Sequence, residues 1–199
     1  MLFQNLKTYH ETRKLKKIGK LVRAGKVPRG VDQDTVFKAL RATKPTPNAV
    51  EVFGILSAHL QKTTGQEHDY GVVSVRKVTE AFTKRLVDAL TDSAVTLAGF
   101  NQHKMGAGST AEATADSDLI TKQAGSQSGN ATQTHGSSSS IYQSVGTLTA
   151  GSSYGCREHG LFNASTGGIL LDRSVVTNID LNTDDIVTWT YALTCTHGG

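Results

Sequence analysis

The sequence predicts a mainly β protein with helices: an antiparallel β-sandwich, jelly-roll or immunoglobulin-like, with one packed amphipathic helix and a basic helical N-terminal arm. Three observations support this prediction. The stretch 154–193 contains short apolar segments separated by turn-forming residues. Its last segment, 186–194, alternates apolar side chains with threonines, as expected for a strand buried on one face. Finally, basic residues are concentrated in the first 30 positions.

The N-terminal segment is expected to be a helix from Leu2 to Ala24, ended by Gly25. Leu15, Ile18 and Val22 recur at the spacing of one helical stripe. Nine basic residues against Glu11 alone make residues 1–30 strongly positive, while the rest of the chain is net acidic. The two parts of the protein should therefore prefer different partners.

A short helix should follow at 35–41, with Asp34 as its N-cap, and it should end before Pro45 and Pro47. The prolines mark a boundary. We therefore divide the chain into a basic helical arm, residues 1–45, and a β-sandwich domain, residues 46–199.

Within the sandwich domain, 50–60 is expected to be a strand and 63–69 a polar loop. Apolar residues then recur at helical spacing, which predicts an amphipathic helix over 75–90 with Ser74 as its cap. Residues 106–140 are rich in glycine, serine, threonine and alanine, and are expected to form a long polar surface excursion that could become ordered only on assembly.

The chain should return to the sheet at 141–148 and then form a hairpin between 156–162 and 169–176. The hairpin turn contains Gly167 and Gly168, at least one of which should have a positive φ. A further short strand is predicted at 179–181, followed by a turn at 182–185 in which adjacent aspartates cap backbone amides.

No arrangement of residues predicts an enzyme, a cofactor or a catalytic group. Cys156 and Cys195 are expected to be two reduced, buried thiols, and a zinc site formed with His159 and His197 is the weaker alternative. Glu158 beside His159 has no accompanying nucleophile. No apolar run is long enough to span a bilayer, and the first residues lack a signal-peptide pattern, so we expect synthesis in a cytoplasm and no membrane partner.

Four segments in the second half of the chain can be compared with a known family: 106–114, 157–168, 170–175 and 186–193. They resemble a family of tailed-bacteriophage virion proteins associated with head genes. The layout is also similar to the β-sandwich modules of phage collar and fibre proteins. The resemblance implies a structural role in a virion assembled in the host cytoplasm, with no catalytic residues.

The expected function is therefore that of a capsid decoration or cement protein, a minor head protein that binds the major capsid protein and is present as a homo-oligomer in the particle. A head–tail connector, collar or tail-appendage protein is one alternative, and a nucleic-acid-binding protein is another. The residues expected to bind the partner all lie in the arm: Arg13, Lys14, Leu15, Lys16, Lys17, Ile18, Lys20, Val22 and Arg23.

Overall fold

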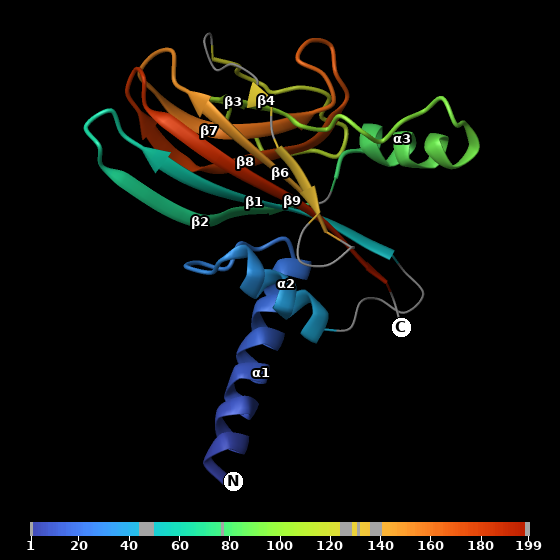
Figure 1. Ribbon diagram of the computed structural model, residues 1–199, viewed down its shortest axis with the longest axis vertical. Coiled ribbons are helices and arrows are strands. Elements are labelled where there is room, and N and C mark those ends of the chain that lie inside the picture. Colours follow the sequence, from blue (N-terminus) through green and yellow to red (C-terminus); the bar gives the residue numbers. More distant parts are fainter. Residues whose placement is uncertain are drawn as a thin grey trace.

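The protein is a β-sandwich with a pair of helices against the outer face of its larger sheet (Figure 1). The computed structural model describes residues 2–43, 50–76, 78–123, 129–130, 132–135 and 141–197. The larger sheet has the order β2 (Glu67–Arg76), β1 (Val50–Gln61), β9 (Ile186–His197), β6 (Ile141–Thr149) and β5 (Thr132–His135). The smaller sheet has the order β4 (Gly129–Asn130), β3 (Gln102–Gly106), β7 (Tyr154–Phe162) and β8 (Leu170–Leu181). All strand pairs are antiparallel, so the predicted fold class is confirmed.

The helices at the N-terminus follow the prediction closely. Helix α1 spans Leu2–Arg23 and is followed by Gly25, whose φ of 68° ends it in the left-handed region. Helix α2 spans Gln33–Ala42, and its N-cap is Asp32, which accepts a hydrogen bond from the Thr35 amide at 2.6 Å. The predicted cap, Asp34, lies inside the first turn instead. The helix therefore begins two residues earlier than predicted.

The predicted helix over 75–90 is wrong at its start. Helix α3 spans Glu80–Thr91, and Thr79 caps it by accepting a hydrogen bond from the Phe82 amide at 3.2 Å. Ser74 and Val75 are buried in β2, where Val75 lies opposite Ile55 of β1. Pairing with β1 and burial under the helices decide the conformation of 67–76, because tertiary contacts outweigh the helical spacing of a few apolar residues.

The polar excursion predicted at 106–140 includes ordered structure. Residues 107–123 pack along the smaller sheet, where Glu112 accepts hydrogen bonds from Arg76 Nε at 2.8 Å and from the Val175 amide at 2.7 Å. Two short strands, β4 and β5, follow. Residues 124–128, 131 and 136–140 lie outside the described residues.

The predicted hairpin is present as β7 and β8, but β8 runs unbroken from Leu170 to Leu181, so the separate strand expected at 179–181 is its continuation. Gly167 has a φ of 62°, which confirms the prediction of a positive φ in this turn. In the next turn, Asp185 accepts hydrogen bonds from the amides of Asn182 and Thr63, as predicted for a turn aspartate.

Gly167→Val is expected to destabilise the protein by roughly 1–2 kcal/mol, because a side chain with a Cβ is disfavoured in the left-handed region. Ser165→Ala, two residues earlier in the same exposed turn, is the matched control and should change the free energy of unfolding by less than about 0.5 kcal/mol. Urea unfolding of the two variants tests this. Equal effects would contradict the tight turn.

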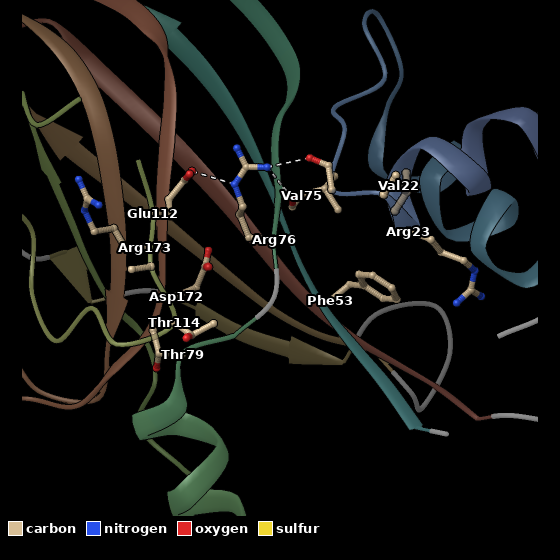
Figure 2. Close-up of a pocket in the computed structure, with 13 residues that line it drawn as sticks. Val22, Arg23, Phe53, Val75, Arg76, Thr79, Glu112, Thr114, Asp172 and Arg173 are labelled. Atoms are coloured by element: carbon tan, nitrogen blue, oxygen red, sulfur yellow. Dashed lines mark hydrogen bonds and ion pairs between the residues drawn. The ribbon is translucent and has the colours of Figure 1, made fainter. Parts of the chain in front are cut away.

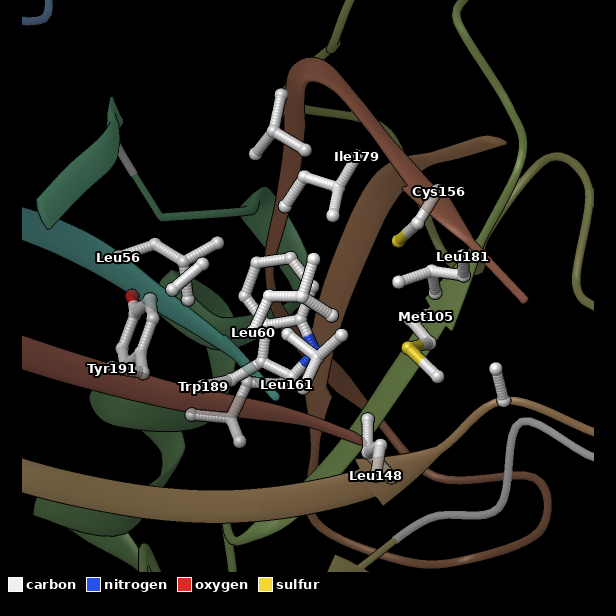
Figure 3. Close-up of a cluster of buried hydrophobic side chains, with 14 of the residues drawn as sticks. Leu56, Leu60, Met105, Leu148, Cys156, Leu161, Ile179, Leu181, Trp189 and Tyr191 are labelled. Atoms are coloured by element: carbon white, nitrogen blue, oxygen red, sulfur yellow. The ribbon is translucent and has the colours of Figure 1, made fainter. Parts of the chain in front are cut away.

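The main core lies between the two sheets. Trp189 and Tyr191 of β9 are both fully buried there, packed among aliphatic side chains from both sheets (Figure 3). These side chains include Leu56, Leu60, Met105, Leu148, Leu161, Ile179 and Leu181. The alternation predicted for 186–194 is thus correct for the face that carries Trp189.

A second core lies on the opposite face of the larger sheet, beneath α1 and α2. Phe53, Ile55, Val72, Val75, Ile141 and Ala192 of the sheet meet Ile18, Val22, Val36, Phe37, Ala39 and Leu40 of the helices. The predicted boundary at residue 45 therefore does not separate two independent cores. Among the described residues, no helix has both the length and the apolar character needed to cross a bilayer.

Candidate functional site

The residues of α1 expected to bind a partner divide between two faces of one helix. The exposed face is basic and consists of Arg13, Lys14, Lys16, Lys17 and Lys20. The opposite face carries Ile18 and Val22, which are 6% and 0% exposed, and the partly buried Leu15. We call the five exposed residues the basic face.

Ile18 and Val22 are buried and Leu15 is partly buried against the same cluster, so this apolar stripe packs within the fold instead of forming the docking surface that was predicted. The outer face of the larger sheet carries its own apolar residues, and the helix pair covers them. An apolar helical stripe next to such a sheet contributes more to stability inside the fold than as an exposed docking surface, at about 25 cal/mol per Å² of apolar area buried. Of the predicted residues between Arg13 and Val22, only those of the basic face remain candidates for binding a partner.

Arg23 holds the end of α1 against α2 and the sheet and does not project outward. Its guanidinium donates hydrogen bonds to the carbonyls of Leu40 and Thr43 at 3.3 and 3.1 Å, and forms an ion pair with Glu51. It also lies 5.8 Å from the centre of the Phe53 ring. Burial lowers the pKa of Arg23. Its role is structural, so it too leaves the predicted set of partner-binding residues.

A cavity of about 340 Å³ lies where the end of α1 meets the sandwich (Figure 2). Its walls come from α1, β1, β2, β8 and the 107–123 segment. Val22, Phe53 and Val75 supply apolar surface, while Arg76, Thr114 and Asp172 supply polar atoms. Arg76 links these elements, since it donates to Glu112 at 2.8 Å and to the Gly25 carbonyl at 2.9 Å.

Asp172 is the unusual group of this cavity. Its side chain belongs to a residue that is 1% exposed, and the Ser174 hydroxyl donates to its Oδ2 atom at 2.8 Å. Within the described part of the chain it forms no ion pair. Burial raises the pKa of Asp172 to about 7, with opposing smaller effects from Ser174 and Glu112.

The neighbouring Arg173 belongs to a separate buried network on the other face of β8. It donates to Glu158 Oε2 at 2.8 Å, to Asp116 Oδ2 at 3.1 Å and to the Thr110 carbonyl at 3.1 Å. Glu158 also accepts from the amides of Gly108, Ile120 and Thr121. This network fixes the 107–123 segment to the sheet, so Glu158 is structural.

His159, the sequence neighbour of Glu158, points into the sandwich core. Its Nε2 atom lies 2.9 Å from Nδ1 of His103, whose Nε2 atom lies 2.9 Å from the Ser144 hydroxyl. Burial lowers the pKa of His103 to about 3 and that of His159 well below its ordinary value. Both rings are therefore neutral at physiological pH and unsuited to exchange protons with a substrate in solution.

The two cysteines are free thiols that do not converge on one site. Cys156 is buried in β7 of the smaller sheet, whereas Cys195 is exposed in β9 of the larger sheet. The expectation of two buried thiols is therefore wrong for Cys195. Within the described ranges, no three histidine, cysteine, aspartate or glutamate side chains are grouped to hold a metal ion.

The sequence contained a signal for the Asp172 cavity that the prediction did not use. Asp172 and Arg173 are adjacent charged residues inside the apolar strand segment 169–176. Successive side chains of a strand point to opposite faces, so one of two adjacent charges in a two-sheet protein points between the sheets. The other is also buried when the outer face of the strand is covered. The sequence did not indicate that the 107–123 segment covers the outer face of this strand, where Arg173 bonds to Asp116 and to the Thr110 carbonyl.

Comparisons with known proteins add no relative. No protein-family model matches the chain, and the searches find no similar curated protein and no similar solved structure.

Proposed function

We propose that the protein is a structural component of a bacteriophage particle, a capsid decoration or minor head protein that docks on the major capsid protein through the basic face of α1. The observation that supports this proposal most directly is that five cationic side chains are exposed together on a helix that extends away from the sandwich (Figure 1). A surface of one charge sign favours a partner of the opposite sign.

The way α1 is anchored also suits a docking role. Its second half is held by Ile18, Val22 and Arg23, so the basic face has a fixed direction relative to the sandwich. Ordering a flexible segment on binding would cost conformational free energy, and a preformed helix avoids much of that cost. The resemblance that we infer between the 157–168 and 186–193 segments and phage virion proteins is the reason for proposing a capsid protein as the partner.

The basic face can be tested by charge reversal. The variant Lys14→Glu/Lys16→Glu/Lys17→Glu/Lys20→Glu is expected to fold but to lose at least tenfold in co-sedimentation with preformed capsid shells. The matched control is Lys26→Glu/Arg29→Glu/Lys38→Glu/Arg41→Glu, which changes the net charge equally at exposed positions outside the basic face. The control should bind shells more strongly than the test variant. Equal binding by the test variant and the wild type would contradict the proposal.

Nucleic acid is the second candidate partner, favoured by the burial of Ile18 and Val22, which leaves the exposed face with charges alone. Against it, Phe3 and Tyr9 are the only phenylalanine, tyrosine or tryptophan residues among the charges of residues 1–30, so base-stacking groups are few. If the face binds phosphates, duplex DNA affinity should fall linearly on a log–log salt plot by about one unit per phosphate neutralised. Tight, salt-dependent DNA binding that the test variant loses, with shell binding unaltered, would favour this candidate.

The number of copies per purified particle separates the decoration role from the connector, collar and appendage roles. A decoration protein should be present in numbers comparable to the capsid subunits, whereas a connector or collar component should be present in far fewer copies, as expected for a single closed ring of cyclic symmetry.

A further inference from the structure

We propose that the cavity between the end of α1 and the sandwich is a binding site for a primary alkylammonium group, with Asp172 as its counter-ion. This proposal is independent of the proposed function. A lysine side chain of another protein and a small free amine both carry the required chemistry.

The composition of the cavity matches an alkyl chain that ends in one positive charge. Val22, Phe53 and Val75 form apolar walls, and Figure 2 shows Asp172 and Thr114 among the side chains that line the same space. The volume of about 340 Å³ lies at the small end of the range for ligand pockets, which is roughly 300–1,000 Å³. A flexible aliphatic amine fits this combination better than a large or purely polar ligand.

The charges around the cavity leave Asp172 without a partner. Arg23 pairs with Glu51, and Arg76 pairs with Glu112. Arg173 pairs with Asp116 and Glu158. These three arginines are thus matched by four carboxylates, and Asp172 is a fifth. A buried carboxylate with no counter-ion is costly, and a bound cation would remove that cost.

Hydrogen-bonding capacity favours an ammonium group over a guanidinium. An ammonium group has three donors, whereas a guanidinium has five donors in a fixed plane. Asp172 already accepts from Ser174, and Thr114 donates its hydroxyl proton to Glu80 Oε1 at 2.8 Å, which leaves the oxygen of Thr114 free to accept. The lone pairs left on these two residues are sufficient for the three donors of an ammonium group, which rotate freely toward them, whereas the donors of a guanidinium are fixed in one plane.

Binding should be coupled to the ionisation of Asp172, because only the carboxylate form attracts the cation. Burial is the main cause of its raised pKa; Glu112 raises the pKa further and Arg76 lowers it. The remaining titratable neighbour is the buried Tyr191 hydroxyl of β9, whose own pKa is raised by burial and by Asp172. With a pKa of about 7, the ionised fraction rises roughly tenfold between pH 6 and pH 8. The affinity for an alkylammonium ion should rise by about the same factor.

The test is calorimetric titration of the full chain with pentylammonium chloride and with Nα-acetyl-lysine N-methylamide at pH 6 and pH 8. Pentan-1-ol is the uncharged counterpart. We expect saturable one-to-one binding of at least one amine, stronger at pH 8, and at least tenfold weaker binding of the alcohol. Absence of binding by both amines, or equal binding of the alcohol, would overturn the proposal.

Two variants locate the site. Asp172→Asn should weaken amine binding at least tenfold at pH 8, whereas Asp34→Asn, an exposed aspartate on α2, should leave it unchanged. Ala113→Leu should also weaken binding, because it fills the rim of the cavity without changing a charge. Unaltered binding by Asp172→Asn would refute the assignment. Binding of the blocked lysine indicates a protein partner as the source of the amine, and binding of pentylammonium alone indicates a free amine.

Discussion

Trp189→Ala is expected to lower the free energy of unfolding by about 3–5 kcal/mol, the usual cost of removing a large buried aromatic side chain. Trp189 is fully buried between the sheets (Figure 3). Its ring centre lies 4.8 Å from that of His159. The truncation therefore leaves a cavity in the main core and also removes the packing surface of the buried histidine pair. Chemical denaturation monitored by far-UV circular dichroism measures the loss.

Trp189→Phe is the matched control. The Nε1 atom of Trp189 has no hydrogen-bond partner among the described residues, so phenylalanine loses volume but no polar contact. We expect it to cost less than half as much as alanine. A melting temperature that is the same for the alanine variant and the wild type would mean that Trp189 is not part of the core.

Asp172→Asn is expected to stabilise the protein at pH 8 and to have little effect at pH 4. The folded state holds the pKa of Asp172 at about 7, well above the ordinary value of 3.8. Between these values the unfolded chain releases the proton and the folded protein keeps it, so the wild type loses stability relative to the variant as the pH rises from about 4 to about 7. The full difference is about 4 kcal/mol, at 1.36 kcal/mol per pKa unit.

Ser174→Ala provides a control of opposite sign. It removes the hydrogen bond that stabilises the ionised carboxylate, so it should destabilise the protein more at pH 8 than at pH 4. Thermal unfolding of both variants across pH 4 to 8 measures the two slopes. A pH-independent difference between Asp172→Asn and the wild type would show that folding does not shift the pKa of Asp172.

The buried histidines oppose Asp172 in the pH profile of the wild type. His103 and His159 have lowered pKa values, so the unfolded chain takes up protons below pH 6.5 that the folded protein does not. Their contribution to stability is present above pH 6.5 and is lost as the pH falls. Removing Asp172 should therefore make the acid sensitivity of the protein steeper, since its compensating effect disappears.

The sheet was largely predictable because strand alternation is a local pattern. Val187, Trp189 and Tyr191 share one face of any strand that contains them. The positive φ in the turn at Gly167 was predicted from the two adjacent glycines of the sequence. The start of α3 was not predictable in this way. Val75 fits the helical spacing with Val78 and Phe82, and only its pairing opposite Ile55 in β1, 20 residues away, assigns it to a strand.

The candidate site was half predictable for a related reason. The sequence shows that Lys14, Lys17 and Lys20 lie on one side of a helix and that Ile18 and Val22 lie on the other. It does not show which of these sides meets the sheet. The apolar side was expected to contact a partner. Instead it packs against the outer face of β1 and β2, which is itself apolar.

The order of layers gives the molecule a direction. Helix α1 projects from the outer face of the larger sheet, and the smaller sheet lies on the other side of the larger one, so a molecule attached through α1 holds β7 and β8 far from the attachment surface (Figure 1). The start of α1 and the end of β9 are both on the helical side. An epitope or enzyme fused to either end would therefore be close to the attachment surface. The exposed turn at Ser165 and Thr166 is the better insertion point for displaying a foreign peptide outward.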